Sequence, residues 1–177
     1  MHPFDSTSFH TVMTTPIDVS VNDSRAEVIS TLEITLALIK RFEGVYLSPY
    51  LCPAGVATIG VGATFYEDGT RVQLDDPPIT RARAEALLLH MVRTVYLPAV
   101  LRLCPALVTA TPERLAAIID FAFNLGAGKL KASTLRRRVN AGQWDQVPAE
   151  LRKWVNGGGR RLTGLVRRRE VEVALVL

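Results

Sequence analysis

The sequence of 177 residues is poor in the side chains that build disulfide frameworks and metal sites. It has two cysteines, Cys52 and Cys104, and three scattered histidines. Two cysteines give neither a disulfide framework nor the ligand spacing of a zinc site, and His90 has no metal-binding partner at i+4. We therefore expect no metal and no cofactor, and synthesis in a reducing compartment.

Long apolar runs are also missing. No uninterrupted run approaches the roughly 18 to 20 apolar residues of a membrane-spanning helix. The N-terminus lacks the basic region and apolar core of a secretory signal. We expect a protein made in the cytoplasm without a signal peptide, which needs a separate route if it acts outside.

Positive charge is concentrated in the last third of the chain. The net charge is +4, but from Lys129 onward there are twelve Lys and Arg against four Asp and Glu. Such an excess favours nucleic acid, an anionic membrane surface or an acidic wall polymer as partner. The arginine triplets 136–138 and 167–169 have no interleaved aromatic residues for base stacking, so we expect no nucleic-acid partner.

The length and the apolar content of 48% suit one domain with two lobes. Residues 1–29 are expected to form a loosely ordered extension, and residues 30–177 the folded domain. Within it we expect a small lobe at about 40–78, a linking helix at about 80–97 and a helical lobe at about 98–177. The predicted fold class is α+β and mainly helical, with a β-hairpin in the small lobe.

Several helix ends are marked by capping residues. Both Ser24 and Ser30 begin a capping box, and we prefer Ser30 as the start of the first helix. The other marked ends are a cap at Thr80 with a stop near Pro98, and a cap at Thr111 with a stop at Gly126.

Glu43 stands at the end of the first predicted helix, before Gly44. Helical geometry places it in line with Leu32, Leu36 and Ile39 on the apolar face. A carboxyl group in apolar surroundings holds its proton more tightly, as a general acid near neutral pH must. The alternative is an ordinary glutamate that turns into solvent past Gly44.

Residues 45–66 alternate short apolar runs with glycines and prolines, a pattern typical of a twisted hairpin. The glycines there have neither dinucleotide-binding nor P-loop spacing. Thr58 lies in a β-like run, where its hydroxyl either satisfies the backbone or holds a water. Cys52 is either a nucleophile or a buried inert thiol.

Four blocks of sequence resemble a known family in the same order: LIKRFEG at 38–44, CPAGVATIGVG at 52–62, FAFNLGAGKLKASTL at 121–135, and WVNGGGRRLTGLVRRREVE at 154–172. They resemble the phage-type lysozymes, the endolysin muramidases. The resemblance covers about residues 30–177 and implies a two-lobed fold around a cleft.

The resemblance implies a role for each matching residue. Glu43 would be the general acid, and Thr58 would place the attacking water. Cys52 stands where the best-known members have aspartate, and a thiol with a pKa of roughly 8.5 acts as a base only if its environment lowers that value. Ala63 replaces a histidine of many members.

The resemblance also implies substrate and partners. The family hydrolyses the β-1,4 bond between N-acetylmuramic acid and N-acetylglucosamine with inversion, which places the two groups about 6.5 to 9.5 Å apart. Phe123 and Asn124 would line the far wall of the cleft, and Arg167 or Arg168 would orient the acid. The partners would be peptidoglycan and the anionic envelope, a holin-type pore would give access to the wall, and we expect a monomer.

A membrane-disrupting or wall-binding protein without hydrolysis is the alternative, based on the basic C-terminal helices. The apolar residues that follow Arg169 alternate at a period of two, from Val171 to Leu177. This spacing does not fit an amphipathic helix, so we favour the enzyme.

Overall fold

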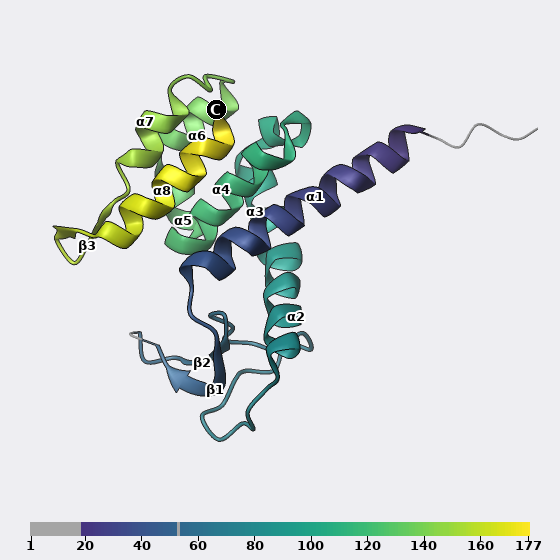
Figure 1. The fold of residues 1–177 in the computed structure, drawn as a ribbon, viewed down its shortest axis with the longest axis vertical. Helices are drawn as coiled ribbons and strands as arrows, with labels where there is room; N and C mark the ends of the chain where they lie inside the picture. The colour runs from purple at the N-terminus through teal and green to yellow at the C-terminus, as the bar shows by residue number, and fades with distance from the viewer. Residues whose placement is uncertain (1–18, 53) are drawn as a thin grey trace, which may run out of the picture.

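The computed structural model describes residues 19–52 and 54–177, with side chains from Arg25 onward. A small lobe with a β-hairpin hangs from a larger helical lobe, and one long helical segment joins them (Figure 1). The elements in order are α1 Val19–Phe42, β1 Tyr46–Leu51, β2 Ala57–Gly60, α2 Arg81–Met91, a π-helical segment Val92–Tyr96, α3 Leu97–Leu103, a 3₁₀ helix Pro105–Thr109, α4 Pro112–Leu125, α5 Ala127–Ala132, α6 Thr134–Asn140, α7 Val147–Arg152, β3 Asn156–Gly157, β4 Arg160–Arg161 and α8 Thr163–Val176.

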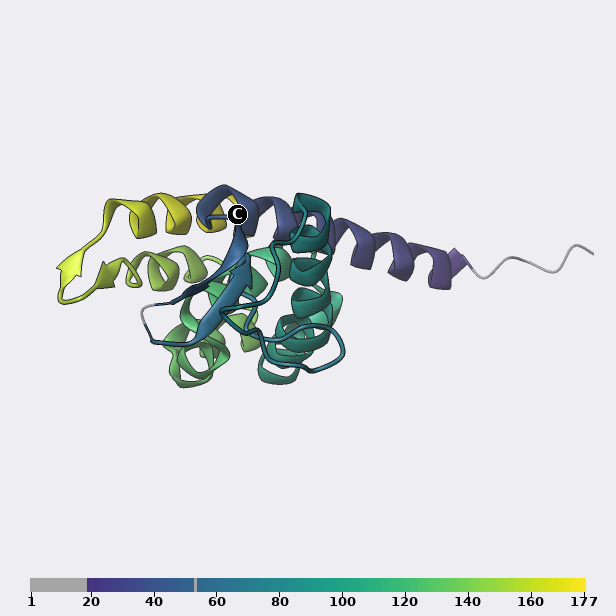
Figure 2. The same ribbon diagram turned by 90° about the horizontal axis from the view of Figure 1, so that it is seen from below.

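The first helix is longer than the sequence predicted. It begins at Val19, not at Ser30, and ends at Phe42 as expected. No glycine or proline lies between Val19 and Phe42, so nothing in the sequence stops the helix from extending toward the N-terminus. Its first turns project beyond the helical lobe (Figures 1 and 2), with Val28 and Ile29 exposed. The predicted loose extension is therefore wrong for residues 19–29; residues 1–18 lie outside the described part.

The predicted hairpin is confirmed. β1 and β2 are antiparallel, with Tyr46 opposite Gly60 and Tyr50 opposite Thr58. Gly60 has φ +65°, and a Cβ there would lie 3.5 Å from the Ala84 side chain of α2. The hairpin therefore turns closely against the linking helix, and this contact fixes the position of Thr58 in the molecule.

The linking helix passes through Pro98, where the sequence predicted a stop. Thr80 caps its start by accepting a hydrogen bond from the Arg83 N–H at 3.1 Å, as predicted. Just before Pro98 the backbone widens into the π-helical segment, which accommodates a ring that would clash in a regular α-helix. The inserted residue rotates the helix surface, and Val95 in this segment is exposed.

The segment Arg81–Leu103 also reaches a mean hydropathy of 1.4 over 18 residues. By length and composition alone it could cross a membrane. One such helix is weak evidence for a membrane protein, and here the helix connects two lobes of a folded domain.

The helical lobe is built around α4, which contacts α1, α5 and α8. Thr111 and Pro112 begin this helix and Gly126, with φ +88°, ends it, as predicted. Seven consecutive residues of α4 are buried, from Ala116 to Ala122. One of the seven is an aspartate, Asp120, and this buried charge is central to the site.

Candidate active site

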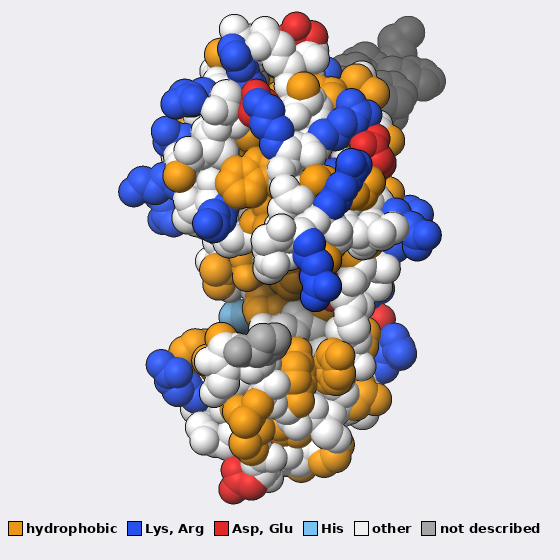
Figure 3. Space-filling model, turned by 90° about the vertical axis from the view of Figure 1, so that its left-hand side faces the viewer, with side chains coloured by type: hydrophobic (Ala, Val, Ile, Leu, Met, Phe, Trp, Pro, Cys, Tyr) orange, Lys and Arg blue, Asp and Glu red, His pale blue; other side chains and the backbone are white. Residues whose placement is uncertain are grey.

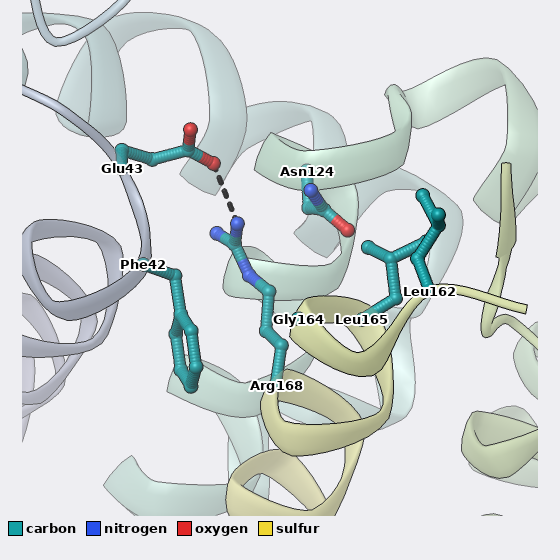
Figure 4. A pocket seen from close by; sticks show the side chains of 7 residues that line it. All are labelled: Phe42, Glu43, Asn124, Leu162, Gly164, Leu165 and Arg168. Atoms are coloured by element: carbon teal, nitrogen blue, oxygen red, sulfur yellow. Dashed lines mark hydrogen bonds and ion pairs between the residues drawn. The ribbon is translucent and has the colours of Figure 1, made fainter.

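Glu43 immediately follows α1, and its backbone N–H donates to the Ile39 carbonyl at 2.9 Å. Its side chain is one-third exposed and opens into a pocket of about 360 Å³. It is therefore neither enclosed by apolar groups nor free in solvent, the two alternatives that the sequence left. Figure 4 shows the residues that line this pocket: Phe42, Glu43, Asn124, Leu162, Gly164, Leu165 and Arg168.

Arg168 holds the Glu43 carboxylate. Its Nη1 donates to Glu43 Oε1 at 2.5 Å, and its Nε and Nη2 donate to the two oxygens of Asp120 at 2.8 and 2.7 Å. Arg168 itself is buried and also lies over the Phe42 ring. Burial lowers the pKa of Arg168, but hydrogen bonds and charge from Asp120, and then from Glu43, outweigh it and raise the pKa overall. The guanidinium is a permanent cation between two carboxylates.

A second buried ion pair lies behind the pocket. Arg169 donates to Glu172 at 2.6 Å and to the Asn124 side-chain oxygen at 3.1 Å. Both charged side chains are fully buried, and Arg169 lies over the Phe121 ring. Burial raises the pKa of Glu172, in part opposed by the charge of Arg169. This pair fixes the Asn124 amide at the wall of the Glu43 pocket.

Thr58 and Cys52 meet in the hairpin. The Thr58 side chain is buried, and its hydroxyl donates to the Val56 carbonyl at 2.9 Å. Hydrogen bonds from the backbone of Val56 and Ala54, and then from the Thr58 hydroxyl, lower the pKa of the partly exposed Cys52 thiol. The environment of Cys52 thus favours the thiolate, the form that can accept a proton.

Tyr50 of β1 lies opposite Thr58 in the hairpin. Burial raises its pKa, and the charges of Tyr46, Cys52 and Glu43 raise it further. The phenol therefore lies within electrostatic range of both Cys52 and Glu43. Tyr96 of the π-helical segment also has a pKa raised by burial and then by the charge of Glu43. Glu43 therefore influences groups of both lobes, Tyr50 in the hairpin and Tyr96 in the linking segment.

The comparisons with known proteins decide the family. The phage lysozyme profile matches residues 40–172. The chain belongs to the phage lysozyme family. It is 36% identical over 144 residues to the endolysin of Acyrthosiphon pisum secondary endosymbiont phage 1, covering 79% of this chain and 92% of that one. It is 33% identical over 143 residues to the SAR-endolysin of Escherichia phage Mu, covering 81% and 78%.

A solved structure agrees with this assignment. The muramidase domain of SpmX from Asticaccaulis excentricus has a TM-score of 0.66 and 31% identity over 81% of this chain and 94% of that one. The lysozyme-like fold and the α+β, mainly helical class are confirmed. The protein is an enzyme of the lysozyme class.

Two of the predicted site residues do not line the Glu43 pocket. Phe123 packs against Tyr96 with ring centroids 4.9 Å apart and does not line the Glu43 pocket. Arg167 is exposed and lines a separate pocket with Arg41 and Glu170. Of the two arginines predicted to contact the acid, the structure brings only Arg168 to Glu43.

Asp120 and Tyr50 were not predicted from the sequence. The sequence could have marked Asp120 as a buried charge. It is the single acid in the apolar run from Ile118 to Ala122, on a helix whose start and end were both predicted from capping residues. A carboxylate in such a run needs a buried partner. In the described part of the chain, no group of three or more His, Cys, Asp or Glu side chains could hold a metal ion.

Proposed function

We propose that this lysozyme is an endolysin that hydrolyses the β-1,4 bond between N-acetylmuramic acid and N-acetylglucosamine in peptidoglycan, with inversion. The observation that carries the proposal is the Glu43–Arg168 contact at the pocket wall, and the lowered pKa of Cys52 beside Thr58 in the hairpin supports it. An acid on one side of the scissile bond and a water-holding group on the other are what inversion requires.

Glu43 would protonate the leaving glycosidic oxygen while Arg168 holds its carboxyl in one orientation. Only one oxygen of Glu43 bonds to Arg168, so the other remains for the proton that is transferred. A side chain held in one rotamer at the reacting bond contributes to catalysis by positioning. Arg168 is therefore proposed as the acid-orienting residue, and Arg167 is not.

Thr58 would hold the attacking water. Its hydroxyl proton is engaged by the Val56 carbonyl, so the oxygen lone pairs are free to accept a hydrogen bond from water. When the hydroxyl instead donates to Cys52, it stabilises the thiolate. The proton of the attacking water passes to Cys52 in this scheme, the position that aspartate occupies in the best-known members.

The substrate would contact both lobes. Asn124 lines the Glu43 pocket, and a second pocket of about 340 Å³ lies between the small lobe and the linking helix. Its lining includes the rings of Phe65, Tyr66 and Tyr96, surfaces suited to the apolar faces of sugar rings. We propose that the glycan strand runs along these two pockets.

The charge distribution supports an anionic envelope as the wider partner. Lys and Arg side chains are spread over the helical lobe, whereas the small lobe mostly presents apolar groups on the face in Figure 3. We propose a monomer that is made in the cytoplasm and reaches the wall through a holin-type pore. The membrane-disrupting alternative has little support, because α8 buries Val173 and Val176 in the core, where they cannot contact a membrane.

The test is the Glu43→Gln enzyme, assayed for muropeptide release from purified peptidoglycan. We expect activity to fall by about 100-fold or more, since glutamine has no proton to donate. Glu33→Gln, the same change at an exposed site on α1, the helix that Glu43 follows, is the matched control and should keep normal activity. Near-normal release by Glu43→Gln would contradict the mechanism.

A further inference from the structure

The Glu43–Arg168 contact raises a difficulty for a general acid. A guanidinium bonded directly to a carboxyl group favours its ionised form, whereas the acid must carry a proton before it reacts. The arrangement around Arg168 resolves this difficulty. Asp120 takes two of its N–H groups in a bidentate ion pair, at 2.8 and 2.7 Å, inside the helical lobe.

We propose that Asp120 is a positioning residue for the general acid, which neutralises Arg168 and fixes its guanidinium so that Glu43 is oriented without being forced to ionise. The proposal rests on the proposed function of Glu43. Asp120 does not reach the pocket itself, and it acts only through Arg168.

The count of buried charges supports this role. Arg168 and Arg169 of α8 are buried cations, and Asp120 of α4 and Glu172 of α8 are buried anions, with exposures of 2%, 0%, 0% and 0%. The four balance one another without Glu43. The buried charges around Arg168 are therefore compensated without Glu43, and an uncompensated buried charge would be costly.

Besides Arg168, the described groups that the charge of Glu43 affects are two phenols. On the hairpin side the charge of Glu43 acts on the phenol of Tyr50, and on the π-helical segment it acts on the phenol of Tyr96. Both phenols are neutral near pH 7, and their pKa values are raised. Asn124, at the pocket wall, is also neutral. Compensation for Arg168 thus depends on Asp120.

The bidentate ion pair between Asp120 and Arg168 suits the task of directing one further N–H group at Glu43. The planar guanidinium presents two parallel N–H groups to Asp120 and keeps a third direction for Glu43. The carboxylate of Asp120 comes from the middle of α4, a rigid and fully buried segment. The direction of the third N–H is thereby set by the packing of α4 against α8.

The first test is Asp120→Asn, which keeps the side-chain shape and removes the charge. Arg168 then faces Glu43 as an uncompensated cation, so the alkaline limb of the pH profile of kcat/KM should move to lower pH by about one unit. Asp145→Asn, the same change at an exposed position of the helical lobe, should leave the profile unchanged. A limb that stays at the wild-type pH in Asp120→Asn would overturn the proposal.

The second variant carries both Asp120→Asn and Arg168→Gln. It leaves no unpaired charge between these two positions, so it can be tested even if the single variant does not fold, with circular dichroism as the check of folding. Loss of orientation should lower kcat, but the alkaline limb should not move to lower pH as it does in Asp120→Asn, because the uncompensated cation that causes that shift is gone. A limb displaced to lower pH in the double variant as well would show that the shift does not come from Arg168, and would overturn the proposal.

The outcomes separate this inference from the proposed function. If Glu43→Gln retains activity, the assignment of Glu43 as the acid is wrong, regardless of the pH profile of Asp120→Asn. If Glu43→Gln is inactive and Asp120→Asn loses activity equally at every pH, Glu43 remains the acid and Asp120 has only a structural role.

Discussion

Arg168 donates to Glu43 and to Asp120 through one guanidinium, joining residues 125 and 48 positions away in the sequence. Three elements meet there: the end of α1, the middle of α4 and the second turn of α8. Since α4 contacts both α1 and α8, the orientation of the acid depends on the core of the helical lobe.

Loss of Arg168 should destabilise the protein because Asp120 would be left buried and unpaired. For Arg168→Met we expect a loss of about 3 to 5 kcal/mol in the free energy of unfolding. Arg152→Met removes an exposed partner of Glu170 and should cost no more than about 1 kcal/mol. Urea unfolding followed by circular dichroism measures both, and equal losses would contradict the buried Arg168–Asp120 ion pair.

The two cysteines should differ in reactivity. The pKa of Cys52 is lowered by hydrogen bonds from the backbone and Thr58, whereas burial raises the pKa of Cys104 to about 11. Iodoacetamide, which reacts with thiolates, should therefore modify Cys52 at a lower pH than an ordinary thiol and leave Cys104 intact in the folded protein. Mass spectrometry of the Cys52→Ala and Cys104→Ala proteins assigns the sites. Faster modification of Cys104 would refute the assignment.

Thr58→Val tests the water-holding hydroxyl. The substitution preserves the shape, and we expect activity to fall about 100-fold, while Thr58→Ser should keep most of it. The unsatisfied Val56 carbonyl should cost about 1 kcal/mol of stability. Thr35→Val is the matched control, a buried threonine whose hydroxyl also bonds a backbone carbonyl, that of Thr31 at 2.7 Å. It should lose stability and keep activity; similar activities for both variants would remove Thr58 from the mechanism.

Gly60→Ala tests how the hairpin is positioned. The backbone has φ +65° there, and the new methyl would lie 3.5 Å from Ala84. We expect a loss of about 1 to 2 kcal/mol, mainly from the left-handed conformation. Gly128→Ala in α5 has an ordinary φ and open space, so it should stabilise by about 0.4 to 1 kcal/mol. Thermal unfolding distinguishes the two, and a neutral Gly60→Ala would contradict the strained turn.

Local signals predicted the ends of several elements well. Thr111 and Gly126 bound α4 because a cap and a positive-φ glycine act through their own backbone. The resemblance predicted the roles at Glu43, Cys52 and Thr58, and these roles remain predictions. The glycine-rich hairpin was recognisable because its residues pair with near neighbours.

Features that depend on distant contacts were not predictable in the same way. Pro98 normally ends a helix, but packing of the linking segment keeps it helical through a π-helical turn. The choice of Arg168 over Arg167 as the partner of Glu43 depends on which side of α8 faces α4. The buried face of α8 could not be recognised from its apolar residues, because they alternate at a period of two. Two of the buried positions on that face are arginines, Arg168 and Arg169.

The anomeric configuration of the first product released from purified peptidoglycan tests the account most directly. With Glu43 as acid and an attacking water held by Thr58 and deprotonated by Cys52, the wild-type enzyme should release the α-anomer at the new reducing end, and Glu43→Gln should release almost none. Initial release of the β-anomer by the wild-type enzyme would mean retention through a covalent intermediate and would contradict the roles assigned to Cys52 and Thr58.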